Sequence, residues 1–268
     1  MQIRLLGTGA SDGIPAFFSD SIVSEYARKH GGKDVRSRAA ALIDGQIKID
    51  LGPDTYLQCV QNGLDPQDWT ALIFTHSHED HFAVSELQYG LIPFTTREYL
   101  EYPIYCNATI RASIRGRYPQ WPLEIKETQS YLSFEHLDYT ITPFAANHKD
   151  DEDSQNLIFQ REGKTLIYAT DTGVYPERTF EFLQRFSVDL LVIECTDGFH
   201  PSGYHGHLSI ESCAKVVGRL RKQGTLPKGS RIITTHHGHA GGATHEQLME
   251  ALAPHGMEPG FDGMVIEV

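Results

Sequence analysis

A cluster of metal-binding residue types follows a short apolar run in the first third of the chain. The run Ala71–Thr75 is typical of a buried strand, and the residues directly after it read HSHEDH. In the turn after such a strand, His76 and His78 can point at one cation, while Asp80 and His81 can serve a second cation beside it. Neutral imidazoles with a carboxylate suit zinc, and manganese and iron are the alternatives. We therefore predict a metal site here. A solvated, histidine-rich loop is the competing interpretation, which the buried strand before it disfavours.

Three further candidate ligands stand where other apolar runs end. His148 follows the run 141–146, Asp171 follows the run 165–170, and His236 follows the run 231–235, each typical of a strand. A carboxylate can bridge two cations, and Asp171 is the natural bridge. The remaining predicted ligands form two sets around it: His76, His78 and His148 for one ion, and Asp80, His81 and His236 for the other. We expect two divalent metal ions, with Zn²⁺ as the first choice and Mn²⁺ or Fe²⁺ as alternatives. His237 and His239 compete with His236, which comes first after its strand.

A histidine before a predicted helix is the candidate for proton transfer. His207 lies in the segment YHGHLS, directly before a helix that Ser209 can cap. The free N–H groups and the dipole at a helix start favour an anion, and an imidazole is suited to donating a proton near neutral pH. We predict His207 and Asp80 as catalytic residues. For His207, a surface histidine at a helix entry is the alternative.

Two residues are predicted to contact the substrate. Ser209 begins the helix beside His207, and Arg115 belongs to a set of arginines at helical spacing, with Arg111 and Arg117, that could clamp a phosphate. A solvated helix face is the alternative for these arginines. The acidic residues 150–153 read as an exposed loop whose charge near the site would repel a polyanion.

Short apolar runs rich in β-branched residues recur along the chain and predict the strands that must position these side chains. The runs lie at 3–6, 40–43, 47–50, 71–75, 139–144, 157–160, 165–169, 189–193, 231–235 and 264–268. Several are continuous rather than alternating, as expected of strands covered on both faces. Helical patterns lie between them: after Ser209, after the capping box of Thr244 and Gln247, from Pro176, and over 54–62.

Strands in the middle with helices outside indicate an α/β (α+β) fold, and we predict one domain over residues 1–268. The stretch 82–128 is the least regular part of the chain. It is rich in aromatic, Pro and Arg residues and reads as an insertion, after the HSHEDH motif, that caps the site.

The composition excludes several classes of protein. The chain of 268 residues has 23 Lys and Arg against 35 Asp and Glu, a net charge of −12, which disfavours a broad nucleic-acid-binding face. No apolar run approaches the roughly 20 residues of a membrane span, and the first residues lack the apolar core of a signal peptide. The four cysteines are widely spaced, which disfavours a disulfide framework. We expect a soluble cytoplasmic protein, binding neither membranes nor long nucleic acids, that could form a homodimer.

The metal-ligand pattern resembles the metallo-β-lactamase superfamily of metal-dependent hydrolases, over essentially the whole chain. The resemblance implies an αββα sandwich with a dinuclear metal site at one edge. It also implies a role for Asp50, in IDLGPD, which matches an early aspartate that orients a ligand histidine. An ordinary turn residue at a strand end is the alternative for Asp50.

Within that superfamily, the chain resembles the PhnP-like cyclic phosphodiesterase branch, a neighbour of the tRNase Z enzymes. The opening GTGASDGIP and the later GHLSIE, TTHHGH, THEQL and FDGMVIEV carry this resemblance. The branch places a histidine at the position of His207 as general acid or phosphate contact. Its members often carry C-x-C-x-x-C after the opening, which holds a structural zinc together with a late histidine. The matching positions here are Ser19, Ser21 and Ser24, with His239 left over, so we predict no structural metal there.

These observations lead to one favoured function and two alternatives. We expect a hydrolase that uses a metal-activated hydroxide on a small phosphate ester or nucleotide, which includes cyclic phosphodiesters. A hydrolase of a carbonyl substrate, such as a thioester, lactone or β-lactam, needs the same pair of ions. The third hypothesis is a non-enzymatic, metal-holding scaffold on the same fold. A tRNase role is disfavoured because no basic, Gly/Pro-rich arm is visible.

Overall fold

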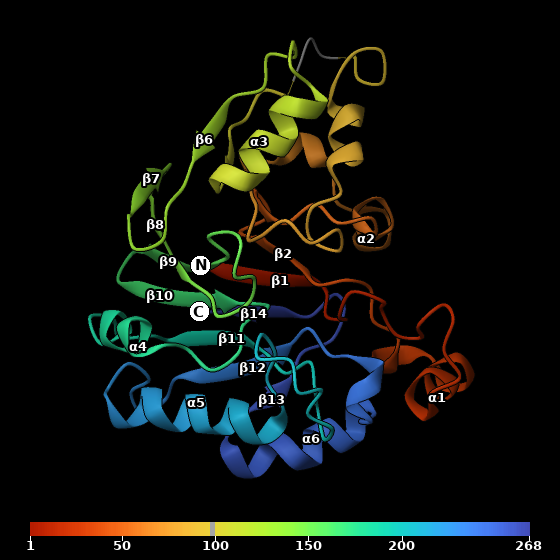
Figure 1. Cartoon of the computed structure of the whole chain (residues 1–268), viewed down its shortest axis with the longest axis vertical. Helices are drawn as coiled ribbons and strands as arrows, with labels where there is room; N and C mark the ends of the chain where they lie inside the picture. Colours follow the sequence, from red (N-terminus) through yellow and green to blue (C-terminus); the bar gives the residue numbers. More distant parts are fainter. Residues whose placement is uncertain (97–99) are drawn as a thin grey trace.

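Two mixed β-sheets form the centre of the computed structural model, which describes residues 1–96 and 100–268 (Figure 1). The first sheet has the strand order β14 (Val265–Glu267), β1 (Gln2–Gly7), β2 (Ala40–Ile43), β3 (Ile47–Ile49), β4 (Ala71–Ile73), β5 (Ile104–Cys106) and β6 (Ile125–Glu127). The second has the order β13 (Glu258–Pro259), β12 (Arg231–Thr235), β11 (Leu190–Glu194), β10 (Lys164–Ala169), β9 (Gln155–Arg161), β8 (Tyr139–Ala145) and β7 (Phe134–His136). Each sheet is antiparallel on one side and parallel on the other, from β3 to β6 and from β10 to β13.

The inner faces of the two sheets share one apolar core. Inward-facing side chains of both sheets are fully buried, among them Ile43, Ile73, Leu157, Tyr168 and Val192. Burying an aliphatic or aromatic side chain of this size contributes about 1.5–3 kcal/mol. The apolar side chains of these strands therefore hold the two sheets together. The apolar runs in the sequence are continuous because a strand that is covered on both faces is apolar on both.

Helices cover the outer faces of both sheets. On the first sheet, Ile110 packs with Leu72; on the second, Val217 packs with Ile167. The covering helices are α2 (Thr55–Asn62) and α3 (Ala108–Arg117) on the first sheet, and α4 (Glu177–Leu183), α5 (Ile210–Lys222) and α6 (His245–Leu252) on the second. The αββα sandwich implied by the sequence is confirmed, as a single domain.

One helix lies apart from this layered body. α1 (Ile22–His30) extends to one side of the sandwich in Figure 1 and has a small core of its own, formed by Ile14, Val23 and Ala27. No predicted element covers it. Short 3-10 turns complete the described elements: η1 (Gly32–Asp34), η2 (Pro66–Asp68), η3 (Val84–Gly90), η4 (His239–Gly241) and η5 (Ala253–His255).

The stretch 82–128 differs from the insertion that the sequence predicts. It supplies α3 and the strands β5 and β6, which continue the first sheet by parallel pairing from β4. Its apolar side chains, such as Leu87, Ile114 and Leu123, pack on the outer face of that sheet. None of its described residues lines the cavity at the histidines, so the stretch extends the sandwich there rather than capping the site. Residues 97–99 of this stretch lie outside the described residues.

Two features bear on the predicted environment. Within residues 1–96 and 100–268, no helix has the length and apolar character needed to cross a membrane. All four cysteines are buried as free thiols.

Candidate metal centre

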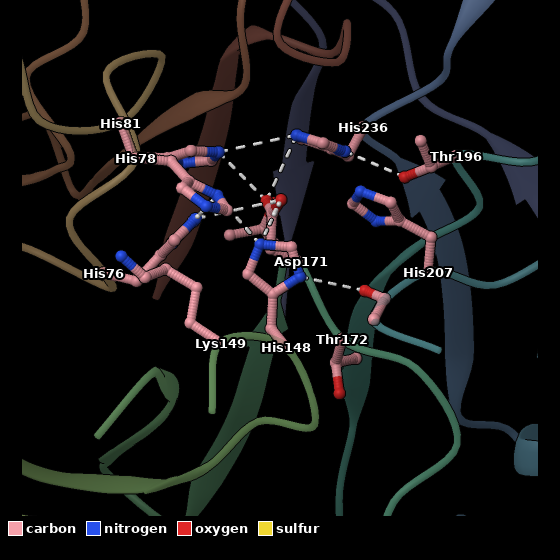
Figure 2. A network of polar contacts seen from close by, with 12 residues as sticks. His76, His78, His81, His148, Lys149, Asp171, Thr172, Thr196, His207 and His236 are labelled. Atoms are coloured by element: carbon pink, nitrogen blue, oxygen red, sulfur yellow. Dashed lines mark hydrogen bonds and ion pairs between the residues drawn. The ribbon is translucent and has the colours of Figure 1, made fainter. Parts of the chain in front are cut away.

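The predicted ligands converge although they come from four separate segments (Figure 2). The HSHEDH turn follows β4, and His148, Asp171 and His236 follow β8, β10 and β12. Because parallel strands end at the same edge of a sheet, the ends of β10 and β12 bring Asp171 and His236 together. In three overlapping groups, the donor atoms all lie within 4.8 Å of one another: His76, His78, His148 and Asp171; Asp80, His81 and His236; and Asp171, His207 and His236.

Asp171 lies between the two predicted sets of ligands. Its Oδ1 lies 3.5 Å from Nε2 of His148 and 3.9 Å from Nε2 of His76. Its Oδ2 lies 2.9 Å from Nε2 of His81 and 3.1 Å from Nε2 of His236. Burial would raise the pKa of Asp171, but the surrounding histidines lower it well below its usual value. An ionised carboxylate with each oxygen facing a different set is the arrangement that a bridging ligand requires.

The first set consists of histidines that are held neutral. Nδ1 of His78 lies 3.1 Å from Nε2 of His76 and 3.0 Å from Nε2 of His148. Nδ1 of His148 donates to the carbonyl oxygen of Gly206 at 3.0 Å, which leaves a lone pair on Nε2. Burial lowers the pKa of all three imidazoles. Three neutral imidazoles with nitrogens this close fit a shared cation.

The second set is organised by Asp50, as the resemblance implies. Nδ1 of His81 donates to Oδ2 of Asp50 at 2.7 Å, and Oδ1 of Asp50 accepts the backbone N–H of Thr75 at 2.8 Å. Nε2 of His81 is thereby turned toward Oδ2 of Asp80 at 3.1 Å and Oδ2 of Asp171 at 2.9 Å. Burial would lower the pKa of His81, yet Asp80, Asp171 and Asp50 raise it well above its usual value. This part of the site strongly attracts positive charge.

His236 is the histidine of the late TTHHGH segment that joins the site. Its Nδ1 lies 2.8 Å from Oγ1 of Thr196, which directs Nε2 toward Asp171. Nε2 of His237 instead lies 3.3 Å from Oγ1 of Thr234, and the ring is buried. His239 belongs to none of the three donor groups found among the described residues, and it contacts other partners, described below.

The donor chemistry of these seven residues fits divalent metal ions. Imidazole nitrogens and carboxylate oxygens are the ligands that zinc accepts, and each set offers three donors besides the shared carboxylate. A lone pair on His81 facing two carboxylate oxygens is repulsive unless a proton or a cation lies between them. The geometry therefore supports the predicted grouping of the ligands.

Three residues of the site have left-handed backbone. Asp50, Asp171 and His236 have φ angles of 60°, 48° and 54°. This conformation is uncommon for residues other than glycine, although aspartate, asparagine and histidine adopt it more readily than most. Each of the three ends or follows a strand of the sandwich, so the rigid sheets hold the backbone in place while the side chains turn toward one another.

His207 is held by a carboxylate that the sequence analysis missed. Its Nδ1 donates to Oε1 of Glu194 at 2.7 Å. Glu194 is fully buried at the end of β11, and it accepts the backbone N–H groups of Thr172, Thr196 and Leu208 at 2.9–3.0 Å. Burial would lower the pKa of His207, but the hydrogen bond to Glu194 raises it to about 9. The only signal for Glu194 in the sequence is its position as a single acidic residue directly after the predicted strand 189–193.

A cavity of about 300 Å³ opens beside the site. His78, Asp80, Asp171, His207 and His236 form one part of its wall. The loop 10–12 after β1, residues of the loop 196–202 after β11, and the segment 238–241 form the rest. A small substrate in this cavity would contact the candidate metal ligands and His207 together.

The two predicted substrate contacts lie elsewhere. Ser209 is the N-cap of α5, and its Oγ accepts the backbone N–H of Ser212 as part of a capping box. Arg115 lies near the end of α3 and donates to the carbonyl oxygens of Leu123, at 2.9 Å, and Trp121. Neither lines the cavity, because each side chain satisfies backbone groups of its own helix end or of the loop after it.

The acidic residues 150–153 also differ from the exposed loop that was predicted. The Glu152 side chain is buried and accepts the backbone N–H and hydroxyl of Ser77, at 3.1 and 2.8 Å, and the amide of Asn107 at 3.0 Å. It thereby fixes the HSHEDH turn. Asp150 and Asp151 are the accessible members of the run.

Comparisons with known proteins give one match in sequence to a family. The sequence profile of the beta-lactamase superfamily domain matches residues 46–237. No curated protein matches the chain in sequence.

Solved structures with the same fold cover the whole chain. They include a diphosphatase of the PhnP family (21% identity, 97% of that chain covered, TM-score 0.78) and Zn²⁺-bound PqqB from Methylobacterium extorquens (16%, 100%, 0.78). The short form of human tRNase Z is a third (19%, 99%, 0.67). At these identities, the likeness shows a shared fold.

Proposed function

The chain belongs to the beta-lactamase superfamily, whose metallo-β-lactamase-fold members are generally hydrolases, and from this premise we propose that it hydrolyses a small phosphodiester with two divalent metal ions. The observation that carries the proposal is the position of Asp171. Its two oxygens face two different histidine sets, at 3.5–3.9 Å and at 2.9–3.1 Å. Two cations sharing one carboxylate is the arrangement used for in-line displacement at phosphorus.

The metal ions would be held as the sequence predicts. His76, His78 and His148 would hold one ion and Asp80, His81 and His236 the other, with Asp171 shared. Zn²⁺ is the first choice for these ligands, with Mn²⁺ and Fe²⁺ as alternatives, and the similar PqqB is a Zn²⁺-bound protein. When bound, such a pair supplies hydroxide near neutral pH and polarises a substrate oxygen.

His207 would act on the substrate from the side of the cavity. Because Glu194 engages Nδ1, Nε2 is the nitrogen left to contact a phosphate oxygen or to protonate the leaving oxygen. Glu194 would keep the ring oriented through that step, and its own three backbone hydrogen bonds fix it. Asp80 would take part in catalysis as a ligand at the cavity wall.

The cavity supports a small substrate rather than a long nucleic acid. Its volume is about 300 Å³, and none of its lining residues in the described chain is Lys or Arg. Binding along a nucleic-acid backbone depends on such cations. Phosphate chemistry is supported by two of the similar structures, which are a diphosphatase and a tRNase by name.

Hydrolysis of bis(p-nitrophenyl) phosphate tests the proposal. The purified protein is loaded with Zn²⁺ or Mn²⁺, its metal content is measured, and release of p-nitrophenol is followed beside a panel of thioesters, lactones and β-lactams. We expect two ions per chain and turnover of the phosphodiester. Turnover of a carbonyl substrate alone, with both ions bound, would identify a carbonyl hydrolase instead. A loaded protein inactive on the whole panel would favour the scaffold hypothesis.

A further inference from the structure

The cavity wall away from the candidate metal ligands has a distinctive charge. It is formed by the loops 10–12 and 196–202 and by the segment 238–241, and it contains Asp12 and Asp197. Among the described residues that line the cavity there is no Lys or Arg to balance them. A second phosphate on the substrate would find no Lys or Arg among these described residues, whereas a hydrogen-bond donor would find carboxylate acceptors.

Asp12 is fixed in this wall by His239. Nε2 of His239 lies 2.6 Å from Oδ2 of Asp12. Nδ1 of the same ring lies 2.9 Å from Oγ of Ser21 and 3.3 Å from Oγ of Ser19. Ser21 is the N-cap of α1, so His239 connects the start of α1 to the cavity wall. The serines stand where the family resemblance places metal-binding thiols, and here their hydroxyls hold the histidine by hydrogen bonds.

One oxygen of Asp12 is left for a ligand. Oδ2 is engaged by His239, but Oδ1 has no hydrogen-bond partner among residues 1–96 and 100–268. The side chain is 45% exposed. Asp197, the other carboxylate of this wall, is only 7% exposed and accepts the backbone N–H and hydroxyl of Ser202. Asp12 is therefore the accessible anionic acceptor in this part of the cavity.

We propose that Asp12, held by His239, binds a hydroxyl or ammonium group on the part of the substrate that does not leave. The substrate class is then a small phosphodiester with one phosphate and a neutral or cationic, hydrogen-bond-donating remainder. This inference rests on the proposed function, because it places the phosphate at the metal ligands in the same cavity. An ammonium group forms the stronger contact with Asp12, since both partners are then charged, whereas a hydroxyl is a neutral donor to the same carboxylate.

A matched series of p-nitrophenyl phosphodiesters tests the inference. Every member has the same leaving group, and the second alcohol is a chain of two to four carbons that ends in methyl, hydroxyl or ammonium. For the wild-type protein we expect kcat/KM to be about tenfold or more higher for the best ammonium ester than for the methyl ester of equal length. The hydroxyl ester should lie between them.

Variants distinguish recognition of the substrate by Asp12 from a general change in the charge around the cavity. D12N removes the charge and keeps the shape, so the ratio of the ammonium to the methyl ester should fall toward one. D12E keeps the charge on a longer side chain and should retain the preference with a shorter optimal substrate chain. D20N removes the charge of an exposed aspartate that does not line the cavity, and it should keep the ratio within about twofold of wild type.

Each outcome decides between explanations. A wild-type ratio near one, or a ratio that D12N does not change, would overturn the inference while hydrolysis of the series upholds the proposed function. A ratio that D20N reduces as much as D12N would assign the effect to the overall charge of this region instead of to Asp12. If no member of the series is hydrolysed by the metal-loaded protein, the proposed function fails and the inference fails with it.

Discussion

Two carboxylate–histidine pairs, Asp50–His81 and Glu194–His207, have the same local geometry in different surroundings. In each pair, Nδ1 of the histidine lies 2.7 Å from a carboxylate that is fully buried. The His81 side chain is also fully buried, and its Nε2 faces the carboxylates of Asp80 and Asp171. The His207 side chain is 19% exposed and lines the cavity.

The comparison shows that the neighbours of a histidine, rather than the carboxylate behind it, decide what it can do. Both carboxylates are anchored by backbone N–H groups, from Thr75 for Asp50 and from three residues for Glu194. Both therefore fix a tautomer and a ring orientation. Nε2 of His81 faces two carboxylates, as the proposed role of metal ligand requires, whereas His207 lines the cavity, as its proposed contact with the substrate requires.

The largest effect is expected from removing the one residue that both histidines approach. D171A deletes the carboxylate between the two ligand sets and should lower kcat on bis(p-nitrophenyl) phosphate by more than about a thousandfold, the equivalent of several kcal/mol. Elemental analysis should show fewer than two bound ions per chain. Wild-type metal content together with wild-type activity in D171A would remove the basis for a shared ligand.

Alanine at each histidine separates the two roles directly. H207A should lower kcat by about 10²–10⁴-fold, the range for loss of a general acid, while metal content stays at the wild-type level. H81A should lose activity together with metal. If both variants lose metal to the same extent, the distinction between the two pairs is wrong.

Substitution of the two carboxylates, Asp50 and Glu194, should separate metal binding from catalysis in the same way, with smaller effects. D50N should weaken metal affinity by about 10–100-fold, and excess metal should restore much of the activity. E194Q should lower kcat without weakening metal affinity, because the hydrogen-bond partners of Glu194 among the described residues are His207 and backbone N–H groups. Competition with a zinc chelator and rates at saturating metal measure both quantities. Rescue of E194Q by excess metal would contradict this assignment.

The Asp50–His81 pair also has a buried lysine next to it. We expect this lysine to affect the stability of the fold and not the activity. Lys48 is fully buried and donates to the backbone carbonyls of Ile49 and Asp50. Burial lowers its pKa from 10.5 to about 8. Between these values the unfolded chain binds the proton and the folded chain does not, so the free energy of unfolding should rise with pH by about 3 kcal/mol.

The variant K48M isolates this contribution. Urea unfolding of wild type and K48M at several pH values from 7.5 to 10 should show a rise for wild type that is absent, or much smaller, for K48M. Parallel pH profiles for the two proteins would show that the Lys48 ammonium is not destabilised by its surroundings. No Lys or Arg side chain lies within hydrogen-bond distance of Glu194 among the described residues.

The candidate ligands could be predicted because they stand close to strand ends. A histidine or aspartate shortly after an apolar run lies at the sheet edge, and His148, Asp171 and His236 all lie within three residues of a strand end. Asp50 needed the family resemblance, since one aspartate at a strand end has many uses. Glu194 was missed for the same reason, without a family motif to single it out.

The failed predictions concern where side chains point. Ser209 caps its own helix, and Arg115 reaches back to carbonyls after α3, and neither choice is visible in residue spacing. The strands β5 and β6 have three residues each, too short for a periodic pattern, so the segment around them read as an insertion. The direction of a side chain and the pairing of a short strand both depend on contacts between segments that are far apart in the sequence.

The left-handed backbone at Asp50, Asp171 and His236 would be adopted most easily by glycine, whereas the site needs a side chain at each of these positions. Glycine adopts this conformation most easily but carries no ligand, and any other residue there costs on the order of 1 kcal/mol. Glycine at position 50 would relieve this cost but would leave the buried N–H of Thr75 and the ring of His81 without their acceptor. The cost of the backbone and the contacts of the side chain therefore cannot be separated by a single substitution.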